Sequence, residues 1–130
     1  MNNISEIRRC AACGAMIEVL EDCKCTSCCG FTCCGKEMQV VKENTSDGAT
    51  EKHVPVITPC GSGVLVKVGD IAHPMIDEHY IMWIEVVCGS VSMRRQLRPG
   101  EPPEAFFEIP YNENLVAREY CNKHGLWKNK

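Results

Sequence analysis

The apolar residues divide the chain into two unequal parts. Residues 1 to about 40 contain little apolar mass apart from Ile17, Val19, Leu20 and Phe31. From residue 53 onward, short runs of β-branched and aromatic residues alternate with Gly- and Pro-containing turns, which is the pattern of β-strands. The runs cover 53–57, 63–69, 80–87, 92–97, 105–109 and 115–120. Six or seven short strands at this spacing predict a β-sandwich, and no segment has a long helical period.

This pattern predicts a small head over residues 1–40, a linker over 41–50 and a body over 51–130. The segment 44–48, Asn-Thr-Ser-Asp-Gly, has the composition of a linker. A chain of 130 residues is long enough for one main domain with a small appendage. Because the head has so few apolar residues, we expect metal binding to supply much of its stability.

Cysteine content is the feature of the composition that bears most on function. Eleven of the 130 residues are cysteine, and eight of these lie between Cys10 and Cys34. The opening residues lack the apolar stretch of a secretory signal, and an odd cysteine count without such a signal favours metal or redox chemistry over a disulfide scaffold. No apolar run is long enough for a transmembrane helix. The formal charge of -3 gives no basic footprint for nucleic acid.

All four histidines lie in the body, and a cysteine accompanies the last of them. The five candidate ligands are His53, His73, His79, Cys121 and His124. Singly, each is a weak signal, because a lone histidine is usually a surface or hydrogen-bonded residue and a lone cysteine a small buried hydrophobe. If the five converge, they exceed the tetrahedral coordination of structural zinc. Four nitrogens in a square with an axial sulfur suit a redox iron with a sixth position open, and the thiolate favours electron donation to an oxygen species.

Several segments of the body resemble the desulfoferrodoxin family of two-iron superoxide reductases. The similar segments are 51–57, 68–75, 79–85, 103–107 and 118–127, within a resemblance that covers nearly all of 45–128. The resemblance implies an immunoglobulin-like β-sandwich that binds one iron through the four histidines and Cys121. It also implies one-electron reduction of superoxide to hydrogen peroxide, with an external electron donor. Glu51 and Lys52 match the family's active-site loop: Lys52 would attract superoxide and order a proton-delivering water, and Glu51 would ligate the ferric ion after the product leaves.

The head resembles the desulforedoxin domain, in which four cysteines hold one iron tetrahedrally. Cys10 and Cys13 match the first pair, and Cys33 and Cys34 match the second because the family pattern continues Cys-Cys-Gly-x-x-Met. The gap between the pairs is longer than is usual for the family. Cys28-Cys29-Gly30 is nearer the usual spacing but lacks the methionine, and it remains an alternative second pair. Four surplus thiols could be alternative ligands, a disulfide or without a role: Cys23, Cys25, Cys28 and Cys29. Zinc could replace the head iron.

The resemblance further implies a cytoplasmic homodimer that receives electrons from a rubredoxin-like donor. Three other functions remain open on the residues alone: a non-enzymatic electron carrier, a zinc-ribbon-like interaction module and a superoxide dismutase. Cys60 and Cys88 have no matching role in the family. We expect four aromatic residues to fill the core: Trp83, Phe106, Phe107 and Trp127.

Overall fold

The computed structural model describes residues 5–21, 24, 30–46 and 53–129. Two compact units make up the chain, Met1–Lys42 and Glu43–Lys130. Every regular element within the described residues is a β-strand, which confirms the predicted mainly β fold. In that part of the chain no helix could cross a membrane.

The first unit contains two very small antiparallel sheets. One has the order β2 (Met16–Glu18), β1 (Ile7–Arg9), β5 (Gln39–Val40), and the other is the hairpin of β3 (Thr32–Cys33) and β4 (Lys36–Glu37). The buried apolar residues of this unit within the described ranges are Ile7, Cys10 and Met38. So small a core cannot be the main source of the unit's stability, in line with its low apolar content.

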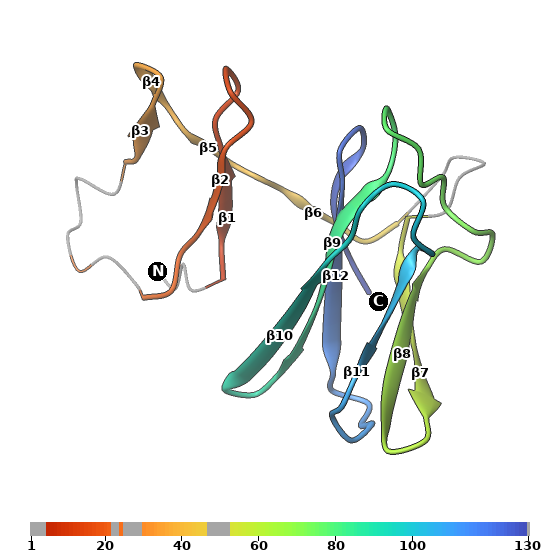
Figure 1. Ribbon diagram of the computed structural model, residues 1–130. Helices are drawn as coiled ribbons and strands as arrows, with labels where there is room; N and C mark the ends of the chain where they lie inside the picture. The colour runs from red at the N-terminus through yellow and green to blue at the C-terminus, as the bar shows by residue number, and fades with distance from the viewer. Residues whose placement is uncertain (1–4, 22–23, 25–29, 47–52, 130) are drawn as a thin grey trace. The chain divides into compact units, whose positions relative to one another are not determined.

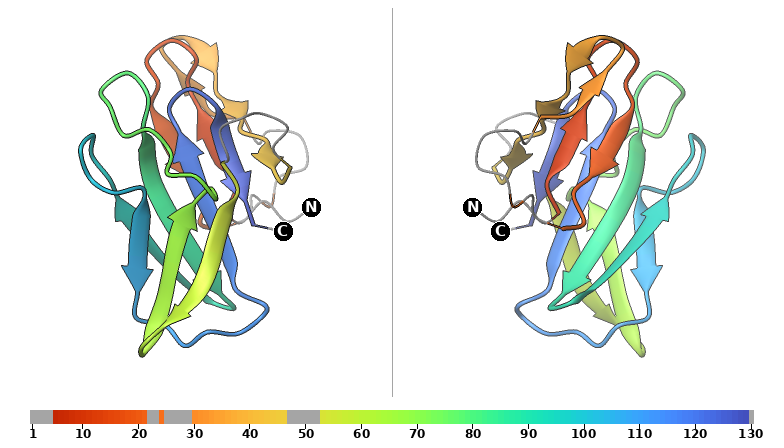
Figure 2. Two further views of the ribbon diagram at one scale, coloured as in Figure 1. Left: turned by 90° about the vertical axis from the view of Figure 1, so that its right-hand side faces the viewer. Right: turned by 90° about the vertical axis from the view of Figure 1, so that its left-hand side faces the viewer.

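The second unit is a sandwich of two sheets. The larger sheet has the order β10 (Val91–Gln96), β9 (Ile81–Cys88), β12 (Val116–Cys121), β13 (Gly125–Lys128), β6 (Glu43–Asn44). The smaller sheet has the order β11 (Glu104–Phe107), β8 (Gly63–Val68), β7 (Pro55–Cys60). The left view of Figure 2 looks onto the smaller sheet, with strands of the larger sheet behind it. All pairings are antiparallel except that of β13 with β6, which is parallel.

The core lies between the two sheets and follows the alternation of the strands. Val64, Val66 and Val68 of β8 are fully buried against residues of β9 and β12, because successive side chains of a strand point to opposite faces. The same rule separates two neighbouring phenylalanines: Phe107 is buried and Phe106 is 40% exposed. The expectation that Phe106 fills the core was therefore wrong.

Part of the segment expected to be a linker belongs to the sandwich. Glu43 and Asn44 form β6 beside β13. The Asn44 side chain donates a hydrogen bond to the carbonyl oxygen of Leu126 (3.0 Å), and Arg118 forms an ion pair with Glu43 (3.0 Å). These partners lie more than 70 residues away in the sequence, so the local composition of 41–50 could not indicate them.

Candidate metal centres

The topology of the sandwich brings the ends of several strands to one edge. His53 lies two residues before β7 begins, and the loop from Val68 to Ile81 carries both His73 and His79. β12 ends at Cys121, and β13 begins directly after His124. Because the strands are antiparallel, the start of β7, the β8–β9 loop and the β12–β13 turn meet at the same end of the unit (Figure 1). All five candidate ligands of the body are therefore neighbours.

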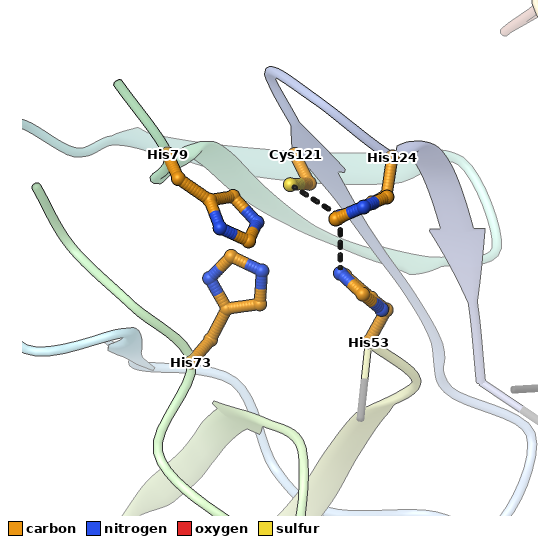
Figure 3. Close-up of side chains that lie close together, drawn as sticks. All are labelled: His53, His73, His79, Cys121 and His124. Carbon is orange, nitrogen blue, oxygen red and sulfur yellow. Dashed lines mark hydrogen bonds between the residues drawn. The ribbon is translucent and has the colours of Figure 1, made fainter. Parts of the chain in front are cut away.

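Figure 3 shows the four imidazole rings gathered around a common centre. The ring centroids lie 4.8 Å apart for His53–His73, 4.6 Å for His73–His79, 4.9 Å for His79–His124 and 4.7 Å for His124–His53. The centroids of His53 and His79, across the centre, are 6.5 Å apart. This diagonal is about 1.4 times the sides, so the rings occupy the corners of a square, the ligand geometry of tetragonal metal sites.

Cys121 adds a sulfur to this square. Its side chain is fully buried in the sandwich core, and its Sγ lies 3.8 Å from Nδ1 of His124. The pairing of β12 with β9 shifts register between Tyr120 and Cys121, a device that redirects a side chain at a strand end. A three-residue loop follows and closes at Gly125, whose φ of +85° suits glycine.

The donor atoms fit a single metal ion. The ligand atoms of the four histidines and Cys121 all lie within 4.8 Å of one another, and Nε2 of His53 is 3.1 Å from Nδ1 of His124. Two nitrogens at right angles, each about 2.1 Å from one ion, would be about 3.0 Å apart. Five donors with this mixture of nitrogen and sulfur fit iron better than four-coordinate structural zinc.

Hydrogen bonds outside the ligand set hold two of the ligand segments. His73 Nδ1 lies 2.8 Å from the carbonyl oxygen of Pro74, so this nitrogen can donate while Nε2 faces the other ligands. Asn122 bridges the two loops: its Oδ1 accepts from the backbone N–H of Tyr80 (2.9 Å), and its Nδ2 donates to the carbonyl oxygen of Glu78 (3.1 Å). The position of His79 is thereby coupled to that of Cys121.

The contact of Trp127 with a candidate ligand was not predicted from the sequence, because Trp127 was expected only to fill the core. Its indole stacks on the His53 ring, with centroids 4.8 Å apart and planes 16° apart. No motif required this contact, although the position of Trp127 three residues after His124 was a signal that it lies beside the ligand loop.

In the head, four cysteines come together from two hairpins. Their ligand atoms all lie within 4.8 Å of one another: Cys10, Cys13, Cys33 and Cys34. The sulfur of Cys33 is 3.6 Å from that of Cys13 and 3.9 Å from that of Cys34. The edge of a tetrahedron with 2.3 Å metal–sulfur bonds is about 3.8 Å, so the four thiols fit one tetrahedral ion. Cys34 (φ +54°) and Gly35 (φ +74°) make the tight turn that follows Cys33.

The crowding of these thiols changes their acidity. A backbone hydrogen bond from Cys13 lowers the pKa of Cys10 to about 7. Hydrogen bonds with the neighbouring sulfurs, first that of Cys13, raise the pKa of Cys33 to about 12, and contact with Cys13 also raises the pKa of Cys34. Without metal, the Cys33 thiol therefore retains its proton at neutral pH, and an incoming ion must displace that proton.

Several residues singled out in the sequence lie outside the described residues: Glu51, Lys52, Cys23, Cys25, Cys28 and Cys29. Among the described residues, Cys33 and Cys34 lie beside Cys10 and Cys13, where a second pair of ligands is expected. Cys60 is exposed, and Cys88 is half-buried with its sulfur 3.7 Å from Nδ2 of Asn112.

Comparison with known proteins agrees with this geometry. A family model for desulfoferrodoxin matches residues 45–130. A desulfoferrodoxin of Nitratidesulfovibrio vulgaris is 49% identical over 98% of each chain, and one of Syntrophotalea carbinolica is 45% identical over 96% of this chain and 95% of its own. The crystal structure of the superoxide reductase from Treponema pallidum matches with a TM-score of 0.72 at 30% identity, over 96% of each chain. Because its sequence is similar over nearly its whole length, and because the similar fold carries the two ligand clusters, this chain belongs to the desulfoferrodoxin family.

Proposed function

We propose that this chain is a superoxide reductase that converts superoxide to hydrogen peroxide at the His4Cys centre. The observation that carries the proposal is the square of four imidazoles with the buried sulfur of Cys121 beside it. Iron held by this ligand set would supply one electron to superoxide. Five protein donors would leave room for a small substrate as a sixth ligand, whereas the four cysteines of the head would satisfy a tetrahedral ion completely.

The charge of the centre suits an anionic substrate. A divalent ion with one thiolate and four neutral imidazoles carries a net charge of about +1, which attracts superoxide although the chain as a whole is acidic. The reaction consumes one superoxide, one electron and two protons and yields one hydrogen peroxide. The protein must therefore admit protons as well as the anion to the centre.

Glu51 and Lys52 are our candidates for handling substrate and product. They directly precede His53, a member of the square. We propose that the Lys52 ammonium would attract superoxide and order a water that delivers a proton, and that the Glu51 carboxylate would serve as a ligand of the oxidised iron. Both proposals rest on sequence position and family resemblance.

The head and the partners complete the proposal. The head metal, iron or zinc, would stabilise its unit and store or relay an electron, since its closed coordination is unsuited to substrate chemistry. We propose a rubredoxin-like protein as electron donor, a homodimer as the assembly and the cytoplasm as the location, all on family resemblance.

The test is the stoichiometry of the reaction of the iron-loaded, reduced protein with superoxide. A reductase forms one hydrogen peroxide per superoxide consumed, evolves no dioxygen and stops unless an electron donor is present. A dismutase would form half as much peroxide together with dioxygen and need no donor. An electron carrier would not accelerate superoxide decay, and a colourless protein that binds only zinc would support an interaction module.

A further inference from the structure

The corners of the imidazole square are held by different means. His73 is oriented by the carbonyl oxygen of Pro74, and the backbone on both sides of His79 is held by Asn122. His53 and His124 form an adjacent pair, with Nε2 of one 3.1 Å from Nδ1 of the other. Trp127 contacts both of these residues.

Trp127 makes two contacts of different chemistry. The flat face of its indole lies nearly parallel to the His53 ring, 4.8 Å between centroids, which limits rotation of that imidazole. Its Nε1–H donates a hydrogen bond to the carbonyl oxygen of His124 at 3.0 Å, which fixes the end of the three-residue loop. The Trp127 side chain thus controls the ring orientation of His53 and the backbone position of His124, which occupy neighbouring corners of the square.

The backbone of Trp127 is itself well anchored. β13 lies between β12 and β6, and Trp127 pairs with Glu119 on one side and Asn44 on the other. The hydrogen bond from Asn44 to the Leu126 carbonyl oxygen holds the residue immediately before it. A side chain mounted on an interior strand is a more rigid support than one on a loop.

We propose that Trp127 is a positioning residue of the His4Cys centre, whose indole sets the orientation of His53 and the placement of His124 toward the metal. It is not a member of the ligand set and acts through these two ligands. Removing such outer contacts typically weakens metal binding or activity about 10- to 100-fold. The inference concerns this site and rests on the proposed function only for its effect on catalysis.

The test compares Trp127→Phe and Trp127→Leu with Trp83→Phe in the full-length, iron-loaded protein. Phe retains a flat ring for His53 but loses the N–H donor, and Leu loses both. Trp83 is the matched control, since it stacks on Tyr120, with centroids 6.1 Å apart, and under the guanidinium of Arg94. The readouts are the absorption and electron paramagnetic resonance spectra of the oxidised body iron, and the rate at which a chelator removes that iron.

We expect graded changes at the body iron. Iron release should accelerate about 10- to 100-fold in Trp127→Leu and less in Trp127→Phe. The absorption and electron paramagnetic resonance spectra should change in both Trp127 variants, while Trp83→Phe keeps the wild-type spectra. If Trp127→Leu does not fold, Trp127→Phe against Trp83→Phe decides the question. Wild-type spectra and release rates in every folded Trp127 variant would overturn the inference. Altered spectra in a protein that does not reduce superoxide would uphold it and reject the proposed function instead.

Discussion

The two metal centres of this chain achieve their geometry by opposite means. In the head, four thiols converge from two hairpins whose strands are only two or three residues long, and two of the four, Cys13 and Cys34, are exposed. In the body, four of the five donors are buried, and they lie at the edge of a sandwich with a continuous apolar core. We therefore expect the head to depend on its metal for structure, and the body to act as a preformed frame for an incompletely coordinated, reactive ion.

The largest effect should come from removing the sulfur donor of the body. We expect Cys121→Ser to lower the second-order rate constant for superoxide by more than about 100-fold, beyond the range seen for outer contacts of metal sites. Rapid mixing of the reduced variant with superoxide, normalised to body iron content, measures this. Cys60→Ser, at an exposed thiol, is the control and should react like wild type; an unimpaired Cys121→Ser would refute the role of the thiolate.

The next largest effect concerns the pH dependence of metal binding at the head. The pKa of Cys33 is raised to about 12 in the metal-free head, so this thiol is protonated below that pH and metal binding must release its proton. Head affinity should therefore rise with pH and fall at least about 100-fold from pH 9 to pH 7, tenfold per unit for each proton displaced. Competition with a chelator at fixed metal concentration measures the change. A head affinity independent of pH would contradict it.

A smaller effect is expected for Lys52→Ala. If Lys52 attracts superoxide as proposed, its loss should slow association with superoxide by about tenfold at low ionic strength. The dependence of the rate on salt should then also flatten, because salt screens such an attraction. Lys67→Ala, at an exposed position on β8, is the matched control. A salt slope unchanged from wild type would reject the steering role.

The smallest effect on catalysis is expected for Cys13→Ser, which removes a head ligand. The variant should lose head metal and unfold the first unit at a lower temperature, because metal binding stabilises such small units. Its rate with superoxide should stay within about twofold of wild type. Calorimetry and metal analysis follow the head, and rapid mixing follows the body. A large loss of activity with the body iron fully loaded would contradict this division.

The sequence predicted the strands of the body well because their signals are local. Runs such as 63–69 and 80–87 correspond to β8 and β9 within one or two residues, since β-branched residues and flanking turns are read over a few positions. β13 was missed because its four residues, Gly125–Lys128, carry little pattern. β6 was missed because its strand pairing, to β13, is non-local.

For the metal sites too, local signals were predicted from the sequence and non-local arrangements were not. Residue types and family resemblance indicated the five body donors, but their arrangement as a square depends on strand ends brought together by the fold. The contact of Trp127 with His53 depends on a strand pairing and a side-chain rotation that no spacing encodes. In the head, the sequence left two second pairs open, and among the described residues Cys33 and Cys34 lie beside Cys10 and Cys13.

The most direct test of the central claim is to observe which iron superoxide oxidises. The protein would be loaded with iron at both centres, fully reduced, and mixed rapidly with less than one equivalent of superoxide while the absorption of each oxidised centre is followed. We predict that the body iron is oxidised first, with one hydrogen peroxide formed per superoxide, while the head stays reduced during that phase. Oxidation of the head iron while the body iron remains ferrous would contradict the assignment.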